Sequence, residues 1–336
     1  MAKPLERGLD CPDQADYIDL IVAGDHGRPR TVPRTICIFE RYAGDVAWRH
    51  FGHTVDGRPK RDLVVRMSAV LDNYDYIFDW VFQQDGTIRV SAGATGIAEV
   101  KLVAQPTAAS ATDDHTRGPL ADAYGRYIAR NLVAVNHDHY LNFRLDLDVD
   151  GTSNHFQRDR LETVTLPAGS PLRSLWVTRP KIARNERDAM VNMDMHNPSL
   201  WRVVNPAVRN QVGYPASYQL HPGMNSETLL SKDDWPRRRA GFIDHHVWVT
   251  PYRANERYAA GLYPTLSQPG AGLPKWTSAN RPIADTDIVL WYTMGMNHIV
   301  RAEDWPVMPV STMSFELRPF DFFHRNPALS ASRTTR

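Results

Sequence analysis

Two histidines separated by one residue, His137 and His139, are the clearest candidates for metal binding in this sequence. Residues i and i+2 of a strand project from the same face, so both imidazoles can reach one ion. A third histidine, His298, follows an apolar run near the C-terminus. Imidazole nitrogen binds zinc, copper and iron alike, so the pattern indicates a three-histidine site without choosing its metal.

The charged residues that follow His298 allow a different interpretation. Arg301, Glu303 and Asp304 could form a solvated surface cluster, with His298 as part of it. The chain contains 13 histidines, so an isolated His-x-His pair is weak evidence for a metal. Both interpretations stay open at the level of spacing alone.

Three aspartates form a second group. Asp146 and Asp148 are again spaced i and i+2, on the polar side of the alternating stretch 141–149, and Asp287 precedes the apolar run 288–295. Three carboxylates with nearby backbone carbonyls suit a hard cation such as Ca²⁺. Spacing alone favours the alternative, three exposed aspartates on a wet face of a sheet.

A tyrosine in an unusual setting lies in the stretch 61–80, which is otherwise rich in the β-branched, aromatic and bulky residues typical of strands. There, Asn73-Tyr74-Asp75-Tyr76 fits poorly into a simple apolar/polar alternation. A buried tyrosine flanked by Asn and Asp needs polar partners. The simpler interpretation is two core tyrosines on one strand.

The rest of the chain predicts short strands at 17–22, 36–42, 46–51, 141–149 and 288–295. Asp85-Gly86 indicates a hairpin turn, and 105–126 reads as an exposed loop. Helical periodicity is confined to 122–133 and 231–241. We therefore expect a mainly β fold, a large antiparallel sandwich or barrel with few short helices, forming one domain over residues 1–336.

Composition narrows the class of function. The formal net charge of +1 gives no electrostatic case for nucleic acid or an anionic membrane surface. No window is long and apolar enough for a membrane span, and no secretion signal is seen. We expect a cytoplasmic protein, or one exported together with a partner. Cys11 and Cys37 could be two free thiols or one disulfide.

Several familiar catalytic motifs are absent from the sequence: a GxGxxG after a strand, a P-loop, GxSxG and HExxH. The remaining histidines His53, His245 and His246 are isolated. We expect them to be surface or hydrogen-bonded polar residues rather than metal ligands.

Taken together, three segments resemble the catalytic domain of copper amine oxidases, the topaquinone-dependent primary-amine oxidases. Asn73-Tyr74-Asp75-Tyr76 resembles the family's cofactor motif, HDHYLNFRLDLDVDG its segment with two copper histidines, and NHIVRAEDWPVMP its segment with the third. Their order agrees, and GLDCP, ICIFE and FFHRNPAL fit as well. The resemblance covers nearly the whole chain and implies a large antiparallel β-sandwich.

The resemblance also implies roles for individual residues. Tyr74 would be the topaquinone precursor, next to Asn73, and a disulfide would join Cys11 to Cys37. Val70 departs from the family's usual Thr or Ser, at a position outside the chemistry. The implied metal ligands are His137, His139 and His298 for Cu(II), with Asp146, Asp148, Asp287 and the carbonyls of Leu147 and Ile288 for Ca²⁺.

By the same resemblance, the protein would oxidise a primary amine with O₂ to an aldehyde, ammonia and H₂O₂. The family's general-base aspartate lies upstream of the segment resembling GLDCP, which here begins almost at residue 1. Asp10 matches a different aspartate of the family, so we do not expect it to act as the general base. We therefore expect residues 1–336 to form a catalytic domain that lacks its own beginning and the family's N-terminal domains. We also expect a second polypeptide that supplies the base, and a homodimeric core.

Two rival interpretations remain. One is a catalytically inactive, metal-binding β-sandwich or interaction subunit, which would keep an unmodified Tyr74. The other is a different three-histidine metalloenzyme, such as an iron oxygenase.

Overall fold

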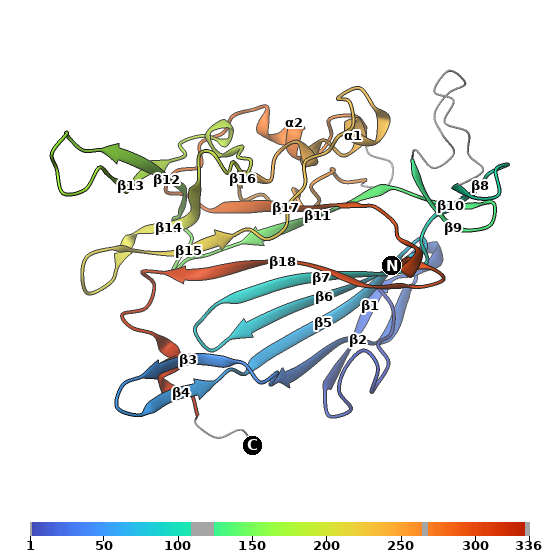
Figure 1. Ribbon diagram of the computed structural model, residues 1–336, viewed down its shortest axis with the longest axis horizontal. Coiled ribbons are helices and arrows are strands. Elements are labelled where there is room, and N and C mark those ends of the chain that lie inside the picture. Colours follow the sequence, from blue (N-terminus) through green and yellow to red (C-terminus); the bar gives the residue numbers. More distant parts are fainter. Residues whose placement is uncertain (1, 109–123, 264–267, 333–336) are drawn as a thin grey trace. The chain divides into compact units, whose positions relative to one another are not determined.

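The computed structural model describes residues 2–108, 124–263 and 268–332 (Figure 1). The chain divides into two compact units, each built from separate segments. The first consists of Met1–His139, Met296–Ser314 and Ala328–Arg336, and the second of Tyr140–Gly295 and Phe315–Pro327. Antiparallel strands dominate both units, so the expected mainly β fold with few short helices is confirmed.

The first unit contains the strands β1 (Asp16–Ala23), β2 (Pro29–Arg41), β3 (Val46–Phe51), β4 (Val55–Pro59), β5 (Asp62–Leu71), β6 (Tyr74–Gln83), β7 (Ile88–Gly96), β8 (Val100–Leu102), β9 (Gly125–Ala129) and β10 (Leu132–Val135). The second contains β12 (His155–Thr165), β13 (Ser174–Ile182), β14 (Ser199–Arg209), β15 (Pro215–His221), β16 (Val247–Pro251), α1 (Trp235–Arg239) and α2 (Leu273–Thr277). Each unit also receives part of β11 (His137–Asp146), β17 (Ile288–His298) and β18 (Met308–Phe320). Short 3₁₀ turns are η1 (Asp25–Gly27), η4 (Glu186–Ala189), η5 (Gly241–Asp244), η6 (Ala302–Asp304) and η7 (Pro327–Ser330).

Within the first unit the strands of the main sheet follow the order β1-β2-β5-β6-β7-β18. The sheet β8-β10-β9 and the hairpin β3-β4 are separate. Within the second unit the order is β18-β15-β14-β12-β13, and a further sheet has the order β11-β17-β16. The strands expected at 17–22, 36–42 and 46–51 correspond to β1, β2 and β3.

The stretch 61–80 forms a hairpin rather than one strand. Its apolar residues lie on β5 and β6, which pair from Asp62↔Gln83 to Leu71↔Tyr74. The turn between them is the dipeptide Asp72-Asn73, with Asp72 at a positive φ of 56°. Asn and Asp tolerate this conformation better than other non-glycine residues. The turn therefore places Tyr74 at the start of β6.

A glycine on the neighbouring strand fits closely against this turn. Gly96 ends β7 with a φ of +111°, and an added Cβ there would lie 2.4 Å from the Asn73 carbonyl oxygen. The next residue, Ile97, donates its backbone N–H to that oxygen. A side chain at position 96 would push the turn away, so glycine is required for this close approach. The expected hairpin turn at Asp85-Gly86 connects β6 to β7 and is also confirmed.

The helix expected at 122–133 is wrong for the described residues of that range. Residues 125–129 and 132–135 form the antiparallel strands β9 and β10, joined by a turn with Asn131 at a φ of 61°. Short apolar runs do not separate helix from strand by periodicity, and here cross-strand pairing decides. Most of the loop expected at 105–126, and residues 122 and 123, lie outside the described residues.

The apolar run 288–295 is the body of β17, whose residues are buried except for Asn297. The run 288–295 is the last strand that the sequence pattern predicts. A further strand, β18, follows β17, and the sequence pattern does not predict it. In the second unit a hydrophobic cluster forms beside β17 from Trp248, Ala259, Leu273, Val289 and Trp291. The helix expected at 231–241 is confirmed in part, since α1 covers Trp235–Arg239.

The two cysteines are joined. Cys11 and Cys37 form a disulfide that links the N-terminal segment to β2. Both residues are buried in a small cluster with Leu5 and Ala15. Of the alternatives left open by the cysteine count, the structure has the disulfide implied by the family resemblance.

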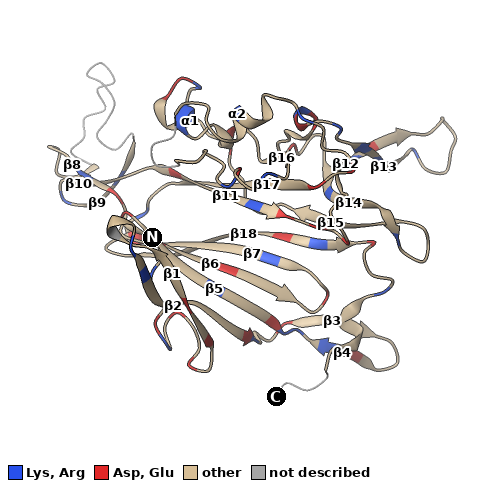
Figure 2. Cartoon of the chain, turned by 180° about the vertical axis from the view of Figure 1, so that it is seen from behind, with Lys and Arg blue, Asp and Glu red and all other residues tan. Residues whose placement is uncertain are grey.

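Charge and hydropathy agree with the composition. Basic and acidic residues are interspersed along the described strands in Figure 2, in keeping with the net charge of +1. Among the described residues no helix has the length and apolar character needed to cross a membrane.

Candidate metal centre and its tyrosine

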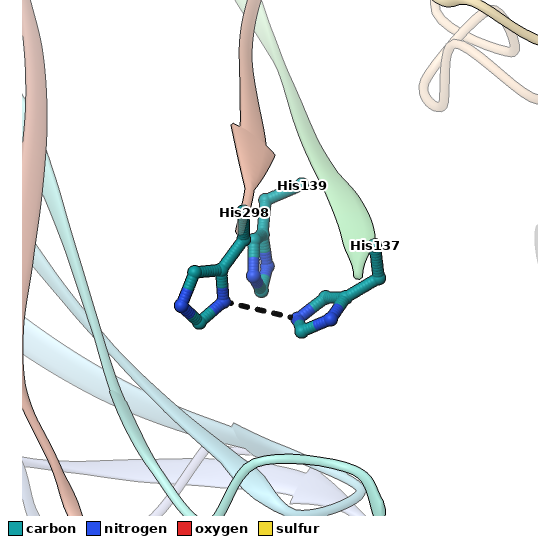
Figure 3. A group of neighbouring side chains, drawn as sticks. All are labelled: His137, His139 and His298. Carbon is teal, nitrogen blue, oxygen red and sulfur yellow. Dashed lines mark hydrogen bonds between the residues drawn. The ribbon is translucent and has the colours of Figure 1, made fainter. Parts of the chain in front are cut away.

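The structure brings His137, His139 and His298 together at the ends of two strands. β11 begins at His137 and β17 ends at His298, as Figure 3 shows. The ring centroids lie 4.7 Å apart for His137–His139, 4.8 Å for His137–His298 and 5.6 Å for His139–His298. One nitrogen of each ring lies within 4.8 Å of the others. This arrangement suits a three-histidine metal site.

Hydrogen bonds assign the free nitrogen on two of the rings. His137 Nδ1 lies 2.9 Å from the Val135 carbonyl oxygen, and His139 Nδ1 lies 2.8 Å from the Tyr76 hydroxyl. This leaves both Nε2 atoms for a metal, and His139 Nε2 is buried without a hydrogen-bond partner. His298 Nδ1 lies 3.3 Å from His137 Nε2, so it also faces the cluster. A buried ring nitrogen without a hydrogen-bond partner is consistent with a metal-binding role, because a metal ion would satisfy it.

The charge state of the rings suits metal binding. Burial, with His137 and His298 nearby, lowers the pKa of His139 to about 4. Burial and His137 also lower the pKa of His298, although the Asp304 carboxylate opposes this. Imidazole binds metals in its neutral form, so these two residues are ready to coordinate at neutral pH.

Asp304 contacts His298 at Nε2, the ring nitrogen other than Nδ1. Its Oδ2 lies 3.6 Å from His298 Nε2, and the Arg301 backbone N–H and guanidinium donate to its carboxylate at 2.8 and 2.9 Å. Burial alone would raise the pKa of Asp304, but the hydrogen bonds from Arg301 lower it overall. Asp304 is only 1% exposed. The solvated-cluster interpretation is therefore wrong for Asp304, because the turn η6 folds it inward; Arg301 and Glu303 are exposed as that interpretation expected.

Tyr74 lies beside the histidines, and it is 4% exposed. Its ring centroid is 5.3 Å from that of His137, 5.0 Å from His139 and 6.5 Å from His298. Its hydroxyl is buried and makes no hydrogen bond of standard geometry. Burial, then the nearby Tyr76 and carboxylates, raise the pKa of Tyr74 to about 12, although the Glu99 backbone amide lies near enough to oppose the rise. The Tyr74 phenol thus lies next to a candidate metal site without a hydrogen bond of standard geometry.

Tyr76 contacts the histidine cluster, although the sequence pattern treated it only as one of two core tyrosines. It is two residues beyond Tyr74, on the same face of β6, and its hydroxyl contacts His139. The period of two could have revealed this proximity, but only the fold brings β11 to the same place. Asn73 lies in the turn before Tyr74, and its role in the site stays a prediction.

The three aspartates also meet, in the second unit. One carboxylate oxygen of each of Asp146, Asp148 and Asp287 lies within 4.8 Å of the others. Asp287 Oδ1 is buried without a hydrogen-bond partner. Burial, then the charges of Asp146 and Asp148, raise the pKa of Asp287, although Arg144 opposes this. Three crowded carboxylates fit a hard cation such as Ca²⁺; the predicted carbonyls of Leu147 and Ile288 stay a prediction.

The structure also places His53, His245 and His246, the three histidines that the sequence pattern left isolated. His53 is exposed in the β3–β4 hairpin. His246 is buried and accepts the Met193 backbone N–H at Nδ1, and His245 packs edge-on against Trp248. The expectation of a surface residue is confirmed for His53, and that of a hydrogen-bonded polar residue for His246.

The antiparallel β fold places three converging histidines, an arrangement typical of metalloproteins, beside a buried tyrosine. Known proteins narrow the class. The family model for the copper amine oxidase enzyme domain matches residues 1–336. The chain belongs to the copper amine oxidase family, whose members use copper and topaquinone, and its histidine cluster fits the copper site.

Individual relatives agree. The chain is 42% identical to the copper-containing amine oxidase gamma 1 of Arabidopsis thaliana, over 98% of this chain and 47% of the relative. It is 42% identical to the peroxisomal amine oxidase alpha 2 of the same plant, over 98% and 49%. The copper-containing benzylamine oxidase of Hansenula polymorpha superposes with a TM-score of 0.89 at 28% identity, covering 99% of this chain and 51% of that one. The chain thus spans about half the length of the relatives it matches.

Proposed function

We propose that this chain is the catalytic part of a copper-dependent primary-amine oxidase. It would hold Cu(II) on His137, His139 and His298, convert Tyr74 to topaquinone, and oxidise a primary amine with O₂ to an aldehyde, ammonia and H₂O₂. The observation that carries the proposal is the buried phenol of Tyr74, whose hydroxyl makes no hydrogen bond of standard geometry and whose ring centroid lies 5.0 Å from that of His139. The family model supports the assignment.

The side chains around the site have distinct tasks in this proposal. The three histidines would hold Cu(II), and the lowered pKa values of His139 and His298 favour their neutral, coordinating form. When bound, copper would activate O₂ for the oxidation of Tyr74: the residue would gain two oxygen atoms and lose two hydrogens, and two O₂ would be consumed with release of one H₂O₂. Burial of Tyr74 keeps bulk water away from the phenol, and Asp304 fixes the orientation of His298.

The general base is the part of the mechanism that this chain does not obviously supply. Asp10 is committed elsewhere, because its carboxylate accepts the Glu6 backbone N–H at 2.7 Å and its carbonyl oxygen accepts from Arg66. We therefore place the base on a second polypeptide that resembles the remaining part of the relatives. It must reach the substrate's α-proton directly or through one water.

Two further parts of the proposal concern organisation. We infer that both units form one catalytic domain, since the family model spans both. We infer a homodimeric core, which the family resemblance supports, and a structural Ca²⁺ at the aspartates of the second unit.

The mass of the peptide that contains Tyr74 tests the proposal directly. After expression with copper and air, we expect two added oxygens and two lost hydrogens, together with a positive quinone-redox stain. Bound copper with unmodified Tyr74 would instead indicate the inactive metal-binding protein, and iron without copper a different three-histidine metalloenzyme, such as an iron oxygenase. Assaying the chain with and without the candidate second polypeptide tests the base, and full turnover by the chain alone would refute the two-chain arrangement.

A further inference from the structure

Two tyrosines compete for the same chemistry at the candidate copper site. Tyr74 and Tyr76 lie on the same face of β6, with ring centroids 6.3 Å apart. Their centroids are 5.0 and 5.9 Å from that of His139, and both residues are buried. Ring distance and burial alone therefore do not explain why only one of them should be oxidised.

Hydrogen bonding separates the two phenols. The Tyr74 hydroxyl makes no hydrogen bond of standard geometry, whereas the Tyr76 hydroxyl lies 2.8 Å from His139 Nδ1. A neutral imidazole that coordinates through Nε2 carries its proton on Nδ1, so this N–H donates to the Tyr76 oxygen. The Tyr76 oxygen is thus bound to the side of the ring that faces away from the metal position.

The packing around Tyr76 holds this arrangement. The Phe78 ring lies 6.3 Å from that of Tyr76 at an interplanar angle of 22°. With Phe78 on one side and His139 at its hydroxyl, the Tyr76 ring has little freedom to swing its oxygen to the metal. A Phe at position 76 would keep the ring contact and remove only the acceptor for Nδ1–H.

We propose that Tyr76 is a positioning residue with two consequences: it fixes His139 with Nε2 towards copper, and the same bond keeps its own phenol from being oxidised in place of Tyr74. This inference rests on the proposed function, because it assigns the copper ligands named there. An outer partner of a metal-bound histidine typically contributes about 10–100-fold to metal affinity. The Tyr76 hydroxyl should contribute within this range.

The first test compares Tyr76→Phe with Tyr17→Phe, a matched control in the first unit whose hydroxyl is buried without a hydrogen bond of standard geometry. Copper affinity is measured anaerobically by chelator competition, with the Cu(II) electron paramagnetic resonance spectrum as a second readout. We expect Tyr76→Phe to weaken binding by about 10–100-fold and to change the spectrum, and Tyr17→Phe to do neither. Parent-like affinity and spectrum in Tyr76→Phe would overturn the positioning role.

The second test uses Tyr74→Phe, loaded with copper and exposed to air. The peptide containing Tyr76 should keep the mass of an unmodified tyrosine, while quinone mass on Tyr76 would overturn the selective role. Failure of the proposed function looks different: the parent protein itself would then bind no copper at its histidines or leave Tyr74 unmodified.

Discussion

The histidine cluster and the aspartate cluster each bring three potential ligands together, but they are built differently. His139 and His298 are buried, and each of the three rings has a second contact, to Val135, Tyr76 or Asp304. In the aspartate cluster, Asp146 and Asp148 are exposed, and three like charges repel one another.

This difference indicates that the histidine cluster is preorganised without a metal ion, whereas the aspartate cluster is not. The lowered pKa values of His139 and His298 favour neutral rings, which pack closely without repulsion, and the outer contacts of the three rings orient their nitrogens. Ionised carboxylates repel one another at close range, so a bound cation is needed to make their proximity favourable. We therefore expect metal removal to leave the histidine cluster largely in place and to loosen the aspartate cluster.

The largest effect is expected from loss of a histidine. His139→Ala removes one of three ligands, so copper affinity should fall by more than the roughly 10–100-fold that loss of an outer partner costs. Tyr74 should then stay unmodified, as peptide mass and copper content will show. His53→Ala removes an exposed histidine and should change neither; quinone formation in His139→Ala would contradict the assignment.

A smaller effect on copper affinity is expected from a change in Asp304, which contacts the ligand His298. Asp304→Asn removes the carboxylate 3.6 Å from His298 Nε2, and copper affinity should fall by about 10–100-fold. Glu303→Gln neutralises the exposed neighbour and is the matched control. Chelator competition on both variants provides the comparison. Equal affinities would show that the carboxylate serves the local fold rather than the ligand.

The pH dependence of the metal-free protein should be smaller again. His139 has a pKa of about 4 when folded, against an ordinary value of about 6.5 in an unfolded chain. Between these values the unfolded state binds a proton that the folded state does not, so stability should fall as pH decreases from about 6.5 to about 4. Urea midpoints over this range measure the slope. It should be shallower in His139→Gln than in the parent and in His53→Gln; equal slopes in all three would remove His139 as the cause.

The smallest effect is expected at the aspartates, with a sign that depends on the cation. Asp287→Asn removes one of three like charges, so it should slightly raise the melting temperature of the calcium-free protein. It should also abolish the further rise that calcium gives the parent. Asp150→Asn, a nearby exposed aspartate, should preserve that rise. If calcium shifts the melting temperature of Asp287→Asn as in the parent, the cluster is not its site.

The sequence predicted much of the fold because strands depend on local patterning. Strand-forming residues, alternation and apolar runs located β1, β2, β3, β11 and β17. The pattern failed where local signals were ambiguous, as in β9 and β10, which looked helical. It also missed β18, whose alternation is interrupted and whose burial depends on the strands beside it.

For the candidate site, the sequence by itself determined the ligand types, the i, i+2 spacing of His137 and His139, and the placement of both tyrosines on one face of a strand. Only the tertiary structure brought in His298, which lies 161 positions from His137, and buried Asp304 behind it. It also decided that Tyr76, and not Tyr74, has its hydroxyl next to His139 Nδ1. The reason is physical: spacing along a strand fixes which face a side chain occupies, whereas burial and hydrogen-bond partners depend on segments that are distant in the chain.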